Sequence, residues 1–187
     1  MSPYRMTKPL LLREPLSMGI FSSKMSSREA LRTFQIESEM IRRGWRARVQ
    51  KCERADSSCH PFAEAPDDWM VRCTYRLARA LIRRGLADVL DDEIARLHIV
   101  EKGPHSIADQ PFKKVLSIMF GSARATSAQL SRNRRSELGN AMAYADAHRV
   151  PSKFVNGFIK QAVLKKCGPK LAADHCEPGF KRVTAHP

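Results

Sequence analysis

The sequence predicts an all-α protein, a compact bundle of about six helices. Apolar residues recur every three or four positions along most of the chain, which is the spacing of one face of a helix. Alternation of apolar and polar residues nowhere reaches strand length with convincing β-branched content. Serines, prolines and glycines stand where helices start and stop. With 187 residues, 43% of them hydrophobic, the chain is long enough to bury a core without disulfides.

The first predicted helix spans residues 26–54 and is both amphipathic and basic. Ser26 and Glu29 have the spacing of a capping box, which satisfies backbone N–H groups at a helix start. Residues 1–25 contain three prolines and no periodic pattern, so we expect a flexible, disordered arm before this helix. The apolar positions of the helix are Leu31, Phe34, Met40, Ile41, Trp45 and Val49.

Residues 67–101 are predicted to form a helical hairpin. Asp67 and Asp68 suit an N-cap and the positive end of a helix dipole. Gly85, directly after two arginines, is typical of a helix end, and a second helix then runs from Leu86 to about residue 100. Cys73 lies on an apolar helical face, so we expect a buried thiol there.

Residues 111–167 form the last predicted helical region, which is basic. Three helices are expected, beginning near Pro111, near Thr126 or Ser127, and around Pro151. Gly121 would end the first of them and the Cys-Gly-Pro sequence at 167–169 the last. The prediction is therefore one helical domain over residues 26–167, followed by an irregular tail, residues 168–187.

The positive charge is large and unevenly distributed. Lys and Arg number 33 against 19 acids, a formal net charge of +14. Residues 42–54 hold six basic groups and one acid, and residues 102–182 hold fifteen and five, whereas residues 67–101 are nearly balanced. Such segregation indicates a polyanionic partner, of which nucleic acid is the commonest. The plain alternative is a charge that only keeps the protein in solution.

The segment from Phe112 to Tyr144 carries the most specific pattern. One uninterrupted helix over residues 126–147 would bury Arg134 in its apolar stripe. Either the helix breaks near residues 132–134, or Arg134 lies at a solvated edge with only its stem packed. A break would leave a short helix before Arg135, an arrangement compatible with a helix-turn-helix.

We therefore predict a non-enzymatic accessory or regulatory protein that binds nucleic acid, most simply duplex DNA, through this basic helical face. Arginine can pair with guanine, and Gln and Asn with adenine. DNA is preferred over RNA because the sequence lacks aromatic platforms that stack unpaired bases. An ordinary solvated helix face is equally compatible with the pattern. The expected contacts are Arg132, Arg134, Arg135, Gln129 and Asn133, with Lys113, Lys114 and Arg124 holding the phosphate backbone.

The alternative is a helical interaction module that binds an acidic protein partner or an anionic membrane surface through the helix from Arg42 to Arg54. Trp45 lies in line with Ile41 and Val49, so core packing is its expected role. The basic face of this alternative is formed by Arg42, Arg43, Arg46 and Lys51.

Other chemistry finds little support in the sequence. It has no phosphate-binding glycine loop, nucleophile elbow or zinc-protease helix, so neither an enzyme nor a cofactor is predicted. The spacings between cysteines and histidines are too long for a structural zinc site, so no metal is expected. Five cysteines, an odd number, and no transmembrane run favour a reduced, cytoplasmic location. The residues considered as metal ligands are Cys52, Cys59, His60, Cys167, His175 and Cys176.

Overall fold

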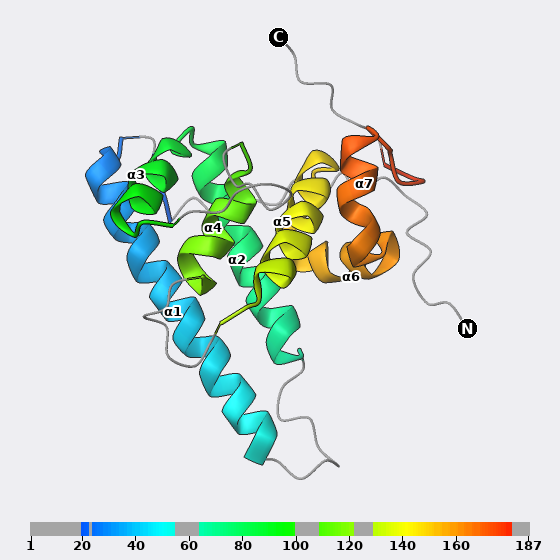
Figure 1. Cartoon of the computed structure of the whole chain (residues 1–187), viewed down its shortest axis with the longest axis horizontal. Coiled ribbons are helices and arrows are strands. Elements are labelled where there is room, and N and C mark those ends of the chain that lie inside the picture. Colours follow the sequence, from blue (N-terminus) through cyan, green and yellow to red (C-terminus); the bar gives the residue numbers. More distant parts are fainter. Residues whose placement is uncertain (1–19, 23, 55–63, 100–108, 122–128, 181–187) are drawn as a thin grey trace.

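The protein is an all-α bundle, as predicted, with one more helix than expected among the residues that the structure describes (Figure 1). This computed structural model describes residues 20–22, 24–54, 64–99, 109–121 and 129–180. The α-helices are α1 (Ser27–Arg54), α2 (Pro66–Arg83), α3 (Asp88–Arg96), α4 (Pro111–Phe120), α5 (Arg132–Ala147), α6 (Val155–Ala162) and α7 (Cys167–Ala172). Two short 3-10 turns, η2 (Ser152–Phe154) and η3 (Leu164–Lys166), flank α6.

Helix α1 begins at the predicted capping box. Glu29 Oε2 accepts hydrogen bonds from Ser26 N at 2.9 Å and from Ser26 Oγ at 2.8 Å, and Glu29 N donates back to Ser26 Oγ at 3.3 Å. Most of the expected disordered arm, residues 1–25, lies outside the described residues. Its described end includes Phe21, which is buried in the core. Order therefore starts before α1.

The buried face of α1 includes Ala30 and Ser38, which were not predicted, whereas Leu31 and Val49 are only partly buried. Met40, expected in the core, is 61% exposed, because it lies off the line of the buried residues. Trp45 is a core residue, as predicted. Its indole N–H donates to Asp67 Oδ1 at 3.0 Å, and its ring meets Phe120 edge-on at 5.5 Å between centroids. The buried residues of α1 are Ala30, Phe34, Ser38, Ile41 and Trp45.

Helices α2 and α3 lie within the predicted hairpin region, but α3 packs mainly against α1 and α4 rather than against α2, and the start of α2 is shifted. Ala65 is the N-cap and Pro66 the first helical residue, so Asp67 and Asp68 lie in the first turn rather than at the cap. The N-cap prediction was wrong by two residues because Pro66 is accommodated at the first helical position. Gly85 turns the chain after α2 with a φ of 69°, a conformation that glycine adopts without strain.

Helix α4 is the centre of the bundle. Every residue from Phe112 to Phe120 is buried, and the helix packs against α1, α2, α3 and α5. A helix that is apolar on one face only would leave its other face in water. Here four neighbours cover all sides, and they enclose even the two lysines, Lys113 and Lys114.

Helix α5 begins later than predicted. Ser131 is its N-cap, and Ser131 Oγ accepts a hydrogen bond from Arg134 N at 3.2 Å. Residues 129–131 are not helical, so they do not form the short helix expected before Arg135. The predicted caps Thr126 and Ser127 lie outside the described residues. Helices α4 and α5 pack together, but the connection between them, from Gly121 to Ser131, exceeds the short turn of a helix-turn-helix.

The end of the chain is more ordered than predicted. The helix expected from about Pro151 to Cys167 is interrupted at Val163, which has a φ of 63°. The tail expected to be irregular from residue 168 contains most of α7, which packs against α5. Pro169 does not break α7, because it lies in the first turn, where backbone N–H groups have no intrahelical partner.

The approach of α4 to α5 depends on Gly139. A Cβ atom built at Gly139 would lie 3.2 Å from Lys113 Cα and closer still to Lys113 Cγ. Gly139→Ala is therefore expected to lower the free energy of unfolding by about 1–3 kcal/mol, because the two helices must move apart. The measurement is denaturant unfolding followed by circular dichroism.

Gly157 is the matched control for this substitution. It also lies within a helix, α6, but a Cβ atom there meets nothing within 4 Å. Gly157→Ala should raise stability by about 0.4–1 kcal/mol, since alanine restricts the unfolded chain and favours helix. Equal effects of the two substitutions would contradict the close approach of α4 to α5.

Candidate functional site

The start of α5, together with Gln129 just before its cap, presents polar residues predicted to face nucleic acid. Gln129, Arg132 and Asn133 are exposed, and the Arg134 side chain is partly exposed, 3.9 Å from Glu137. The Ser131 cap fixes where this turn begins, so these side chains project from the end of the helix. The structure thus brings four of the predicted site residues together at one helix terminus.

The arginine charges at the start of α5 are repelled by the positive end of the helix dipole. The N-terminus of a helix carries the positive end of the helix dipole, where acids are stabilising and bases are not. Helix α5 has no acidic residue in its first turn and instead places Arg132, Arg134 and Arg135 there. An anion bound at this end would offset both the dipole and the arginine charges.

Arg135 has a structural role. Its Nη1 atom donates a hydrogen bond to the carbonyl oxygen of Leu130 at 2.6 Å, and its guanidinium lies beside Gly121. The side chain therefore ties the segment before α5 to the end of α4. This interaction was not predictable from the charge pattern, because it depends on where α5 starts.

The two predicted phosphate-binding lysines of α4 are not at the surface. Lys113 is 4% exposed and Lys114 9% exposed. Lys114 Nζ donates to Asp91 Oδ1 of α3 at 2.5 Å, and Lys113 packs against Gly139 of α5. Their expected role was wrong, because α4 is enclosed on all sides and long lysine stems fill space between helices. Arg124 lies outside the described residues.

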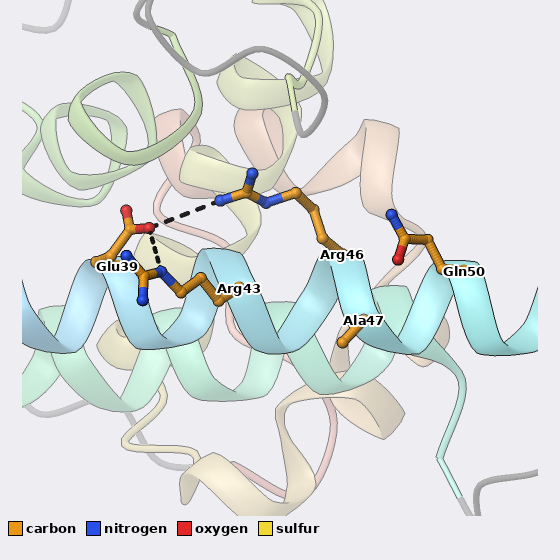
Figure 2. A pocket seen from close by; sticks show the side chains of 5 residues that line it. All are labelled: Glu39, Arg43, Arg46, Ala47 and Gln50. Carbon is orange, nitrogen blue, oxygen red and sulfur yellow. Dashed lines mark hydrogen bonds and ion pairs between the residues drawn. The ribbon is translucent and has the colours of Figure 1, made fainter.

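The second basic face, on α1, is partly neutralised by one acid. Figure 2 shows Glu39 joined by dashed lines to both Arg43 and Arg46, and Arg42 also pairs with it. The hydrogen bond from Arg43 lowers the pKa of Glu39, and although burial opposes this change, the charges of Arg42 and Arg43 add to it. Arg43 remains 76% exposed in its side chain.

A shallow hollow of about 410 Å³ lies beside these residues on α1. It is lined by Glu39, Arg43, Arg46, Ala47 and Gln50, all on one helix (Figure 2). Helix α4 packs against both α1 and α5, and Figure 1 shows the two basic helices on opposite sides of it. The two predicted basic faces are therefore separate surfaces.

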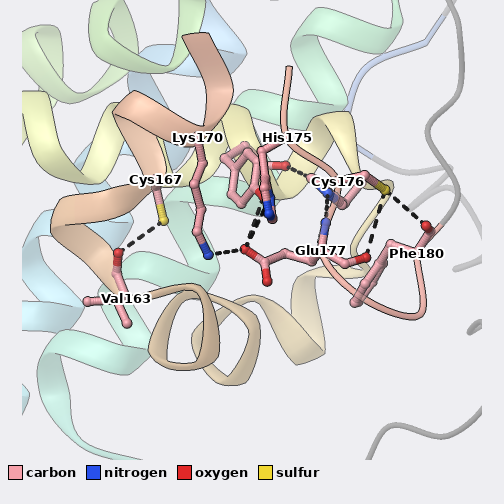
Figure 3. Close-up of polar contacts among 9 residues, drawn as sticks. Val163, Cys167, Lys170, His175, Cys176, Glu177 and Phe180 are labelled. Atoms are coloured by element: carbon pink, nitrogen blue, oxygen red, sulfur yellow. Dashed lines mark hydrogen bonds and ion pairs between the residues drawn. The ribbon is translucent and has the colours of Figure 1, made fainter. Parts of the chain in front are cut away.

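The C-terminal segment is held by a polar cluster that the sequence pattern did not reveal (Figure 3). Tyr144 Oη donates to Glu177 Oε1 at 3.0 Å and lies 2.9 Å from His175 Nδ1. Lys170 Nζ binds the same Glu177 oxygen. His148 Nδ1 lies 2.8 Å from the Tyr144 carbonyl, which can only accept, so Nδ1 carries the proton and Nε2 accepts from Glu177 N at 3.0 Å.

The pKa shifts in this cluster fit groups that are buried and hydrogen-bonded to one another. Burial raises the pKa of Tyr144, and the hydrogen bond to Glu177 raises it further. Burial also raises the pKa of the Glu177 carboxyl, but hydrogen bonds from Lys170 and Tyr144 lower it more, so the net pKa lies below the ordinary value. Every one of these groups already has a partner, so the cluster fixes the tail to α5.

The cysteines in the described part of the chain form no disulfide. Cys52, Cys73, Cys167 and Cys176 are all free, and no group of three or more potential metal ligands occurs in the described ranges. Burial raises the pKa of Cys73, as expected for a core thiol, and raises that of Cys167 to about 11. The remaining candidate ligands, Cys59 and His60, lie outside the described residues.

Across the part of the chain that is described, no helix combines the length and the apolar character needed to cross a membrane. Comparison with protein-family models, with curated proteins and with solved structures finds no match to this chain.

Proposed function

We propose that the protein is a non-enzymatic accessory or regulatory protein that binds nucleic acid, duplex DNA in preference to RNA, through the first turn of α5. The observation that carries the proposal is an exposed, arginine-rich helix N-terminus with no acidic residue in its first turn. Phosphate groups would supply negative charge there, and Gln129 and Asn133 add uncharged donors.

The packing of α5 limits how it can approach a duplex. From Leu138 onward most of its residues are buried, so the helix is not free to lie along the major groove. Only its first turn can reach the nucleic acid. We therefore expect contacts mainly to phosphate oxygens, with weak dependence on sequence and strong dependence on salt. The proposed contacts are now Arg132, Arg134, Gln129 and Asn133.

Binding of the full chain to a short random DNA duplex, followed by fluorescence anisotropy over a salt series, tests this proposal. The double variant Arg132→Gln/Arg134→Gln should bind more weakly. The slope of log affinity against log salt should fall by about 2, one for each phosphate group that the variant no longer neutralises. The cytoplasm remains the proposed place of action.

The matched control removes two charges from α1. Arg43 and Lys51 are both exposed there, so Arg43→Gln/Lys51→Gln changes net charge equally without touching α5. This control should leave the salt slope close to that of the unmodified protein. Absence of DNA binding at low salt would refute the proposal, and a larger loss in the α1 variant would move the site to α1.

The alternative function, a module that binds an acidic protein partner, is supported by a different feature. Ile36 and Met40 are large apolar side chains exposed one helical turn apart on α1, and Arg43 follows them on the same face. Apolar and basic groups side by side suit a partner helix with an acidic flank. Binding of an acidic amphipathic peptide that is weakened by Arg43→Gln/Lys51→Gln and not by Arg132→Gln/Arg134→Gln would favour this function.

A further inference from the structure

The face of α1 that points away from the other helices is exposed. It presents Ile36 and Met40, which are 53% and 61% exposed and are two of the three large apolar side chains exposed in the described residues. Arg43, Ala47 and Gln50 continue the exposed line toward the end of the helix. Along this line the residues follow one another in alternating steps of four and three, the spacing of the seam between two helices in a coiled coil.

The line has a projecting part and a hollow part. Ile36 and Met40 are large, whereas Ala47 is the smallest residue lining the shallow hollow of about 410 Å³, which Arg43 and Gln50 also line (Figure 2). In a coiled coil, each large side chain of the seam inserts into a hole formed by residues of the facing helix. One helix therefore carries both the projection and the hollow that could receive it.

A second copy of α1 running in the opposite direction brings these two parts together. The register that places Met40 against Arg43 of the second copy also places Ile36 against Ala47 of the second copy. Two-fold symmetry repeats both contacts. The flexible Met40 side chain can lie along the apolar stem of Arg43. Because each copy supplies a projection to the hollow of the other, the surface is complementary to itself.

The charges on this face favour the same antiparallel direction. In this register Glu29 faces Arg54 of the second copy, and Arg32 faces Glu53 of the second copy; all four residues are exposed. Within one chain Arg32 and Glu53 lie about 30 Å apart along the helix, so they cannot pair with each other. A parallel arrangement would instead place Arg43 against Arg43 and Arg54 against Arg54, which repel.

We propose that the exposed face of α1 binds a second copy of this chain through an antiparallel two-helix interface, with Ile36 of each copy against Ala47 of the other. An interface of one helix pair is small, so the dimer should be weak and should depend on protein concentration. The surface is separate from the first turn of α5, so it does not depend on the proposed nucleic-acid binding. An acidic protein partner is the competing occupant of this face.

Sedimentation equilibrium of the full chain over a range of concentrations tests this interface. Moderate salt is needed, because it screens the long-range repulsion between two chains of net charge +14. Ile36→Lys should weaken dimerisation by about tenfold or more, because it removes the apolar projection and places a cation beside Arg43 of the second copy. Val163→Lys is the matched control, since Val163 is also an exposed apolar residue, 48% exposed, but lies outside α1. It should leave the dimer unchanged.

A charge exchange tests the direction of pairing. Arg32→Glu should weaken the dimer by about three- to tenfold, because two like charges then face each other in each of the two symmetric contacts. Arg32→Glu/Glu53→Arg should restore the dimer, because opposite charges meet again across the interface. Circular dichroism should show an unchanged helix content in each variant, since every substituted residue is exposed.

The proposal is overturned if the chain stays monomeric at every concentration, if Ile36→Lys and Val163→Lys have equal effects, or if the charge exchange does not restore the dimer. A chain that stays monomeric but binds an acidic amphipathic peptide, with binding lost in Ile36→Lys, would assign the face to another protein and would also overturn it.

Discussion

Asp146→Ala is expected to lower the free energy of unfolding by about 3 kcal/mol, a fall in Tm of roughly 6–12 °C for a chain of this size. Asp146 Oδ1 accepts from Arg79 Nε at 2.9 Å and lies 3.6 Å from Arg83 Nη2. The Arg79 side chain is only 8% exposed. Burial, and then the charge of Arg79, already lower the pKa of Arg83. Asp146→Ala removes the carboxylate that Arg79 and Arg83 share, so two positive charges remain close together without it.

A double variant distinguishes an uncompensated charge from a loss of packing. Arg79→Met/Asp146→Leu removes both charges and keeps apolar volume, so it should be more stable than Asp146→Ala. Asp92→Ala, on the exposed surface of α3, is the control and should change stability by no more than about 0.5 kcal/mol. The measurement is urea unfolding at neutral pH. A loss below about 1 kcal/mol for Asp146→Ala would contradict the role of the pair.

Glu177→Gln is expected to cost about 2 kcal/mol at neutral pH, because Lys170 then loses its anionic partner in a largely buried place. This cost is smaller than for Asp146 because Lys170 is less buried than Arg79. Limited proteolysis should show cleavage after α7 in the variant, since the contacts of Glu177 with Tyr144 and Lys170 hold this segment to α5.

The cost of Glu177→Gln should depend on pH in a defined direction. The folded protein holds the pKa of Glu177 below the ordinary value of 4.5, so the unfolded chain binds its proton more readily. The stabilisation by Glu177 is therefore complete above that value and declines as the pH falls below it. The difference in Tm between the variant and the unmodified protein should shrink in acid. Glu53→Gln, on the exposed end of α1, should show no such trend.

The features of the fold that depend only on residues close together in the sequence were predictable. The Ser26–Glu29 capping box and the turn at Gly85 depend on residues within one helical turn, and both are present. The break at Val163 was not predictable, because valine rarely adopts a positive φ and no glycine or proline marks the place. Tertiary packing imposes that conformation, and the sequence pattern contains no sign of it.

The candidate site was predictable only in part, for the same reason. The apolar stripe around Arg134 correctly indicated an irregularity, and α5 does begin at Arg132. The burial of Lys113 and Lys114 depends on Gly139 and Asp91, which belong to other helices. Charge patterns locate basic segments, but they do not show which side of a helix the neighbours cover.

The carbonyl oxygen of Val150 links α2 to the segment that follows α5. Tyr75 Oη and Arg79 Nη1 both donate to the oxygen of Val150, at 2.8 and 2.9 Å, across 75 and 71 residues of chain. A long loop must close before either bond can form, and loop closure opposes this with chain entropy. Individual helices can form in microseconds, but this junction cannot form from local contacts. We therefore expect the folding rate to be limited by the meeting of α2 with the end of α5.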